Sequence, residues 1–151
     1  MSVRLHLLAH NLRSRENVGS LFRTADSLGV AKIWLSGYTP VPPDQKISKV
    51  ALGAENVVPF EAHPAIEPVL ACLKEKQIPV YALELTPYAI PLSAFEPPPE
   101  MALLLGTETT GIPPSLLEQC VASIYIPQQG IKESLNVTIA TAIASWKILQ
   151  V

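Results

Sequence analysis

Short apolar runs alternate with stretches of helical periodicity from one end of the chain to the other, and this alternation restricts the possible folds more than any other feature. The apolar runs predict buried strands at residues 3–9, 31–36, 56–60, 78–85, 101–106 and 121–127. The helical patterns predict helices at residues 17–29, 64–76, 113–119 and 134–150. Strands and helices in alternation are typical of an α/β domain with a largely parallel sheet, and such sheets bind ligands beyond the carboxyl ends of their strands.

The composition is that of one folded domain in a reducing compartment. Of the 151 residues, 48% are hydrophobic and 16% charged, so the chain can form a core; at about 100–200 residues per domain, we expect a single domain over residues 1–151. The two cysteines, Cys72 and Cys120, make no disulfide framework and are expected in the core. The chain shows no signal-peptide pattern, and no apolar run reaches the roughly 18 residues of a membrane span. We therefore expect a cytoplasmic protein.

The basic side chains are few but concentrated. Eleven Lys and Arg against 13 Asp and Glu give a formal charge of −2, which excludes a polycation that coats nucleic acid but leaves room for a local basic patch. Arg13, Arg15 and Arg23 lie within eleven residues that lead from the first predicted strand into the first predicted helix. Such a cluster suits a phosphodiester backbone. The alternative is that Ser14 and Asn17 cap the helix and that Arg23 is simply solvated.

A second polar segment follows the strand predicted at residues 101–106. Gly106 and Gly111 bracket four polar residues, but Ile112 comes next instead of the Lys-Ser/Thr pair of a phosphate-binding P-loop, so we reject a P-loop. Two glycines at this spacing suggest a backbone that turns sharply and comes close to another group. Glu108 in the turn is then either a surface acid or a carboxylate that positions other residues.

A third segment leads into the last predicted helix. Ser134 is a suitable N-cap, and the helix that follows is apolar on nearly all sides, which predicts burial on more than one side. Its small residues allow close packing either within the domain or across a dimer. Asn136 stands out, because an amide in the first turn of a buried helix must find partners. A bound ligand is one candidate partner, and a cap alone is the other reading.

Two kinds of site are not supported by the sequence. The three histidines, His6, His10 and His63, have no metal-ligand spacing with the two cysteines, so we expect no metal. The chain has no G-x-S-x-G elbow, which argues against a serine hydrolase.

Taken together, the three segments resemble the three signature motifs of the SpoU/TrmH family of RNA ribose methyltransferases, within the SPOUT class. The matching stretches are residues 17–26 (NVGSLFRTAD), 105–113 (LGTETTGIP) and 126–140 (IPQQGIKESLNVTIA). The resemblance covers essentially the whole chain, with the motifs in the family's order. It implies an α/β parallel-sheet SPOUT fold with a C-terminal deep trefoil knot, which is a rare exception to the rule that protein chains are unknotted.

The resemblance also implies a cofactor, partners and site residues. The family binds S-adenosylmethionine in its knot, works as a homodimer and methylates tRNA or rRNA, without a metal. The positions that match its cofactor contacts are Leu83, Gly106, Ile126, Ser134 and Leu135. Arg23 matches the arginine proposed to activate the ribose 2′-hydroxyl. The polar residues that order the same site are matched by Asn17, Glu108, Ser134 and Asn136.

These residue types suit methyl transfer to a ribose. A 2′-hydroxyl is a poor nucleophile and needs a base or strong polarisation. Because the pKa of arginine lies above about 12, we expect Arg23 to act mainly by stabilising the developing alkoxide. We expect the chain to be a catalytic domain without the extra RNA-binding domain of larger members. RNA affinity would then come from local patches joined across a dimer, made of Arg4, Arg13, Arg15, Arg23, Lys46 and Lys49.

Three other functions are compatible with parts of the sequence. One is a catalytically inactive knotted module that binds S-adenosylmethionine or RNA, although all five polar motif residues are present. Another is methylation of a base instead of a ribose, but the third motif resembles that of the ribose-methylating enzymes more closely. The last is a flavodoxin-like nucleotide binder, for which the chain offers no phosphate loop.

Overall fold

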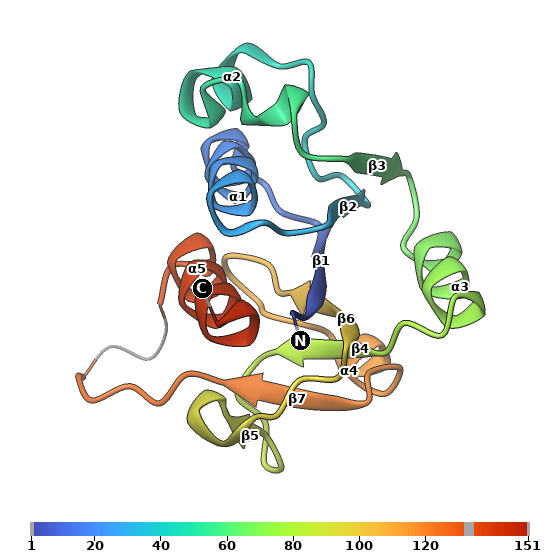
Figure 1. Cartoon of the computed structure of the whole chain (residues 1–151), viewed down its shortest axis with the longest axis vertical. Helices are drawn as coiled ribbons and strands as arrows, with labels where there is room; N and C mark the ends of the chain where they lie inside the picture. Colours follow the sequence, from blue (N-terminus) through green and yellow to red (C-terminus); the bar gives the residue numbers. More distant parts are fainter. Residues whose placement is uncertain (1, 132–134, 151) are drawn as a thin grey trace.

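The computed structural model describes residues 2–131 and 135–150, which form one sheet flanked by helices (Figure 1). The strands are β1 (Arg4–His10), β2 (Lys32–Ser36), β3 (Phe60–His63), β4 (Val80–Leu83), β5 (Ile90–Pro91), β6 (Glu100–Leu105) and β7 (Ala122–Tyr125). The helices are α1 (Arg15–Leu28), α2 (Gln45–Ala51), α3 (Glu67–Glu75), α4 (Pro114–Leu117) and α5 (Val137–Leu149), with 3-10 helices η1 (Ala54–Asn56) and η2 (Leu92–Ala94).

Every strand pair in the sheet is parallel, and the strand order is β3-β2-β1-β6-β4-β7-β5. The predicted α/β fold with a parallel sheet is therefore confirmed. The trefoil knot stays a prediction. The order brings β6, β4 and β7 together as neighbours, although more than twenty residues separate the start of β7 from that of β6 in the chain. The carboxyl ends of these three strands consequently meet at one edge of the sheet.

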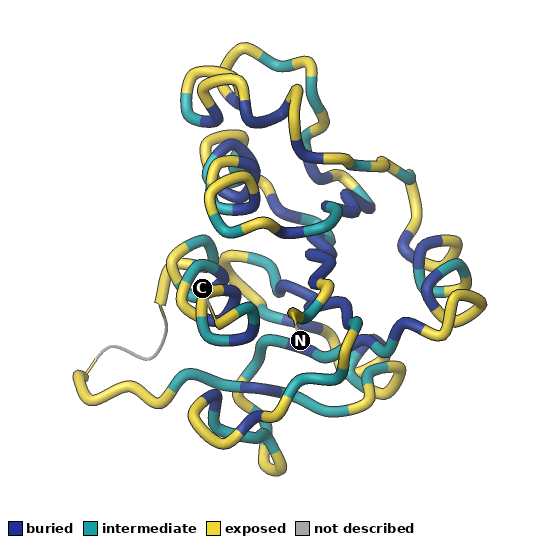
Figure 2. The backbone as a smooth tube through the Cα atoms, viewed as in Figure 1, coloured by how far each residue is buried: buried dark blue, intermediate teal, exposed yellow. Residues whose placement is uncertain are grey.

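The sheet is buried on both faces, since helices cover each of them. Along β1, Leu5 and Leu7 belong to a core that includes residues of α1 and α5, whereas Leu8 belongs to a second core with residues of α3 and α4. Side chains that alternate between two buried faces produce the continuous apolar runs seen in the sequence. Figure 2 shows the result, with buried strands inside and exposed outer faces on the helices. Cys72 and Cys120 are half-buried against the second core, so the core prediction holds for them only in part.

The sequence predicts no helix between β2 and β3, and this prediction is wrong. The sequence indicates no regular element at residues 49–54, whereas α2 begins at Gln45 and covers the first half of this stretch. Its N-cap is Asp44, whose carboxylate accepts hydrogen bonds from the backbone N–H groups of the next turn. The helix buries only Ile47 and Ala51, so its apolar period is too short to detect.

The strand predicted at residues 56–60 is displaced toward the C-terminus. The backbone N–H groups of Val57 and Val58 both donate to the carbonyl of Ala54, which keeps this part of the apolar run in a turn after η1. β3 begins only at Phe60. The same apolar run therefore spans a turn and a strand. β5 and η2 lie in a segment predicted as a loop, because elements of two and three residues show no period.

The last helix begins later than predicted and is less buried. α5 starts at Val137, and the side chain of Asn136 caps it by accepting a hydrogen bond from the N–H of Thr138 at 2.8 Å. Ser134, the predicted N-cap, lies outside the described residues. One side of α5 is buried through Thr141, Ala144, Ser145 and Ile148.

The opposite side of α5 is exposed. The prediction that this helix is buried on more than one side is therefore wrong for the isolated chain. Ile139, Ile143 and Trp146 are 54%, 42% and 56% exposed. No described element of the chain packs over these side chains. The all-round apolar pattern predicted a second covering surface that this chain alone does not provide.

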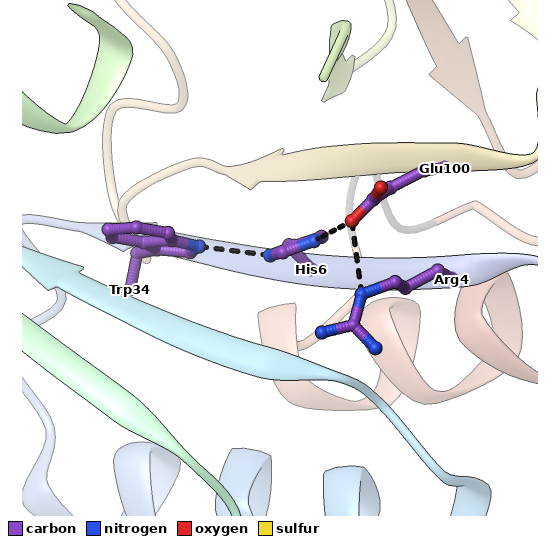
Figure 3. A network of polar contacts seen from close by, with 4 residues as sticks. All are labelled: Arg4, His6, Trp34 and Glu100. Carbon is purple, nitrogen blue, oxygen red and sulfur yellow. Dashed lines mark hydrogen bonds and ion pairs between the residues drawn. The ribbon is translucent and has the colours of Figure 1, made fainter. Parts of the chain in front are cut away.

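A hydrogen-bond chain at the amino-terminal half of β1, away from the carboxyl ends of the strands, leads from the buried Trp34 and His6 to the more exposed Glu100 and Arg4 (Figure 3). The indole Nε1 of Trp34 donates to Nδ1 of His6 at 3.2 Å, so this nitrogen must carry a lone pair. Nε2 of His6 then carries the hydrogen and donates to Oε2 of Glu100 at 2.7 Å, an oxygen that also accepts from Arg4. Burial lowers the pKa of His6, and this effect outweighs the opposing influence of Glu100. His6 is therefore held in its neutral form.

We expect this neutral histidine to make the stability of the protein depend on pH. The pKa of His6 is lower in the folded state than its ordinary value of 6.5, so its stabilising effect is complete above pH 6.5 and is lost as the pH falls through the folded-state value. The free energy of unfolding, measured by denaturant titration between pH 7.5 and 5, should fall by up to about 1.4 kcal/mol per pH unit for each such group.

Two variants separate the contributions of His6 and His10 to the slope of the free energy of unfolding against pH. His6→Gln, which keeps a donor and an acceptor but does not titrate, should flatten it. His10→Gln is the matched comparison, because burial lowers the pKa of His10 as well. An unchanged slope in His6→Gln would contradict the assignment.

Candidate functional site

A cavity of about 1160 Å³ lies at the carboxyl ends of β4, β6 and β7. Its walls are the segments that follow these strands together with the first turn of α5. The edge formed by the carboxyl ends of parallel strands is where α/β sheets bind ligands. The volume is sufficient for a ligand of the size of a nucleoside derivative.

Four of the five predicted cofactor-binding residues line this cavity. Leu83 ends β4, Gly106 follows β6, Ile126 follows β7 and Leu135 precedes α5. The fifth, Ser134, lies outside the described residues. The structure thus brings together four positions that are far apart in the sequence, and their contact with a cofactor remains a prediction.

Gly106 has no room for a side chain. A Cβ atom added there would lie 3.0 Å from the backbone of Gly111 and 3.2 Å from the side chain of Ile112. The segment between the two glycines folds back on itself, since the N–H of Thr107 donates to the carbonyl of Gly111 at 3.3 Å. Gly111 has a φ of +72°, which side chains other than glycine rarely adopt. The sharp turn predicted from the two glycines is confirmed.

Glu108 connects this turn to the start of α1. Its carboxylate accepts hydrogen bonds from the backbone N–H groups of Arg13 and Ser14, each at 3.1 Å, and from Nδ2 of Asn17 at 3.2 Å. Burial raises the pKa of the Glu108 carboxyl, but the hydrogen bonds outweigh burial and lower it below the ordinary value. Ser14 caps α1 by accepting from the N–H of Asn17, so the side chain of Asn17 is not the cap and is directed to Glu108. Glu108 is a positioning carboxylate in the ionised form.

Asn136 lies on another wall of the same cavity. Its Oδ1 is engaged in capping α5, and its Nδ2 has no hydrogen-bond partner within residues 2–131 and 135–150. Both readings of this residue therefore fit, because one end of the amide is a cap and the other is available as a donor.

Arg23 does not belong to this cavity within one chain. It is exposed on α1, two turns beyond Asn17, and it is absent from the cavity wall. The described parts of the chain offer it no hydrogen bond or ion pair. The sequence spacing places Glu16, Ser20, Arg23 and Ser27 on the face of α1 opposite its apolar side. In the structure, Ser20 is half-buried and the other three are exposed.

The predicted basic patch is only partly assembled. Arg13 and Arg15 follow the carboxyl end of β1, and Arg15 is paired with Asp44 at 3.4 Å. Arg4 begins β1 at the other end, at a distance of about 20 Å for a strand of this length, and it pairs with Glu100. Arg4 therefore does not join Arg13 and Arg15 in one patch within a single chain, and a patch joined across a dimer stays a prediction.

Sequence reasoning missed Glu84. This residue directly follows β4, lines the cavity and accepts a hydrogen bond from the N–H of Ile112 at 2.8 Å through Oε2. A signal was present, because Glu84 is the only charged residue in the predicted strand 78–85 and lies near its carboxyl end.

The part of the chain that the structure describes contains no group of three or more His, Cys, Asp or Glu side chains that could hold a metal ion. None of its helices is long and apolar enough to cross a membrane.

The parallel sheet and the cavity at its edge define an α/β protein with a candidate ligand site, and sequence comparison assigns the family. The sequence model of the SpoU rRNA Methylase family matches residues 4–146, so the chain belongs to this family.

Named relatives and solved structures agree with this assignment. The chain is 32% identical over 146 residues to a tRNA (guanosine(18)-2'-O)-methyltransferase of Mus musculus, covering 95% of this chain and 9% of the relative. It is 30% identical over 138 residues to the 23S rRNA (guanosine-2'-O-)-methyltransferase RlmB of Acinetobacter baylyi, covering 87% and 53%. The crystal structure of an AdoMet-bound rRNA methyltransferase from Sinorhizobium meliloti superposes with a TM-score of 0.89 at 25% identity, covering 99% and 57%. The chain thus spans about half or less of the length of these proteins.

We expect loss of the Glu108 carboxylate to release the start of α1. In Glu108→Ala, the N–H groups of Arg13 and Ser14 lose their acceptor, so their amide hydrogen exchange should accelerate and the free energy of unfolding should fall by about 1 kcal/mol. Thr109→Ala, at the exposed neighbouring position, is the control and should change neither quantity. Unchanged exchange at both amides in Glu108→Ala would refute the connection.

Proposed function

We propose that this protein is an S-adenosylmethionine-dependent RNA methyltransferase that methylates a ribose 2′-hydroxyl of tRNA or rRNA. The observation that carries the proposal is the cavity at the carboxyl ends of β4, β6 and β7, which gathers residues from the second and third motifs of the SpoU family. The names of the relatives support the reaction, and the AdoMet-bound structure of one of them supports the cofactor.

The residues present fit this cofactor. Leu83, Ile126 and Leu135 offer apolar surface for an adenine ring, and the missing side chain at Gly106 permits close approach to the backbone. The carboxylates at the cavity suit a cationic ligand. When bound, S-adenosylmethionine supplies a methyl group activated by its sulfonium charge. We propose that these residues and Ser134 hold it, within the knot that the family resemblance implies.

The polar residues would prepare the ribose. Glu108, ionised and bound to the start of α1, fixes the position of Asn17 relative to the cavity. Arg23 would stabilise the alkoxide that develops on the 2′-oxygen. Its guanidinium keeps its proton at neutral pH and therefore cannot accept one as a base. The free Nδ2 of Asn136, together with Ser134, would donate to the ribose or to its phosphate.

We propose a homodimer that covers the exposed side of α5. Ile139, Ile143 and Trp146 form an apolar surface there, and apolar surfaces of this kind mark protein interfaces. α1 packs beside α5 (Figure 1), so a second copy on α5 would also come close to the helix that carries Arg23. Dimerisation could thereby complete a site to which Arg23 has no access within one chain.

We place this activity in the cytoplasm, in keeping with the two free thiols.

Calorimetric titration and a methyl-transfer assay test the reaction. The wild type should bind S-adenosylmethionine with a dissociation constant of about micromolar magnitude. Gly106→Val should abolish binding, because its side chain would meet the backbone of Gly111. Arg23→Ala should bind normally but fail to transfer methyl groups to total RNA, with 2′-O-methylnucleosides identified by mass spectrometry.

Each of the other outcomes has a definite meaning. Absence of binding in the wild type would refute the proposal. Binding without transfer would support the inactive binding module, and a methylated base in the product would contradict ribose specificity.

Sedimentation tests the dimer. The wild type should sediment at twice the 16.3 kDa of the chain at micromolar concentration, and Trp146→Glu should yield the monomer, since a charge at the centre of an apolar interface is costly. Gln119→Glu adds the same charge at an exposed site outside α5 and should remain dimeric. A wild type that sediments only at 16.3 kDa would refute the proposal.

A further inference from the structure

Glu84 is held firmly at the cavity by groups on both sides. Its backbone N–H donates to the carbonyl of Ile124 on β7 at 2.9 Å, which continues the sheet beyond β4. Its Oε2 accepts from the N–H of Ile112 at 2.8 Å. The carboxylate therefore has a fixed position between the end of β4 and the turn that follows β6.

Only one of its two oxygens has a structural task. The backbone of Gly111 lies against Oε2, so that a Cβ added at Gly111 would approach this oxygen to 2.4 Å but Oε1 only to 3.6 Å. Within residues 2–131 and 135–150, Oε1 has no hydrogen-bond partner. A carboxylate that served only to hold Ile112 could be replaced by an uncharged acceptor. The contacts among the described residues thus do not require the negative charge of Glu84.

The described residues of the cavity wall include acidic but no basic side chains. Glu84 and Glu108 are the acidic ones, and none is Lys, Arg or His. The Glu108 carboxylate is compensated by N–H groups of Arg13 and Ser14 and by Asn17. Glu84 receives a single backbone hydrogen bond. Glu84 is therefore the less compensated of the two charges, and a cleft lined by one sign of charge concentrates its field on the ligand.

We propose that Glu84 makes the cavity distinguish the cationic methyl donor from its neutral product. This inference rests on the proposed function. As the methyl carbon bonds to the ribose 2′-oxygen and the hydroxyl proton passes to water, both electrons of the broken carbon–sulfur bond stay on sulfur. The sulfonium thereby becomes a neutral thioether. The attraction between Glu84 and the ligand disappears at that moment, while the apolar contacts of adenine persist. Glu84 would thus favour entry of the donor and exchange of the spent product.

Binding measurements with three ligands test the proposal. The wild type, Glu84→Gln and Glu118→Gln are titrated with S-adenosylmethionine, with S-adenosylhomocysteine and with sinefungin, in which an amine-bearing carbon supplies the positive charge. Glu84→Gln retains an oxygen that accepts from the N–H of Ile112, so the turn keeps its anchor. Glu118→Gln removes the same charge from an exposed position outside the cavity and is the matched control.

The expected result is a change in selectivity. Glu84→Gln should weaken the binding of both cationic ligands about tenfold and that of neutral S-adenosylhomocysteine less than twofold. Glu118→Gln should change none of them. Equal weakening of all three ligands by Glu84→Gln would overturn the proposal, because it would indicate a contact with their shared part or a disturbed turn. Unchanged binding would overturn it as well. The proposed function is judged separately, by whether the wild type binds S-adenosylmethionine at all.

Discussion

The arrangement of the candidate site depends on the hydrogen bonds between Glu108 and the start of α1. This carboxylate joins segments 95 residues apart in the chain, the turn after β6 and the loop after β1. β1 and β6 are neighbours in the sheet, so the two loops emerge side by side, and the ionised carboxylate meets N–H groups at a helix N-terminus, where negative charge is favoured. One interaction therefore fixes the turn, orients Asn17 and sets the cavity against α1.

The parallel sheet makes this arrangement possible. Its order aligns the carboxyl ends of β6, β4 and β7, so the cavity can form from loops alone, while the strands beneath are buried on both faces. The rigid network of His6, Trp34 and Glu100 lies at the amino-terminal half of β1. The polar groups of the sheet thus lie in two separate sets, one around the neutral, buried His6 and the other at the accessible cavity.

Sequence reasoning recovered those parts of the structure that have a clear period or a familiar motif. The long apolar runs predicted the sheet, and the motif resemblance predicted that Leu83, Gly106, Ile126 and Leu135 would lie together. It failed where tertiary contacts decide: α2 buries only two residues, and the run before Phe60 is turned by backbone hydrogen bonds to Ala54. Glu84 belongs to no motif; its charge near the end of a predicted strand was a signal, but its contact with Ile112 and its place at the cavity wall come from the structure.

Every described residue of the cavity wall lies between Leu83 and Ala140. The first half of the chain supports this wall from outside, through the pairing of β1 with β6, the packing of α1 beside α5 and the hydrogen bonds to Glu108. α2, β2 and β3 contribute no residue to the described wall. Substitutions on the surfaces of these elements can therefore change the exterior of the protein while the residues of the cavity stay the same.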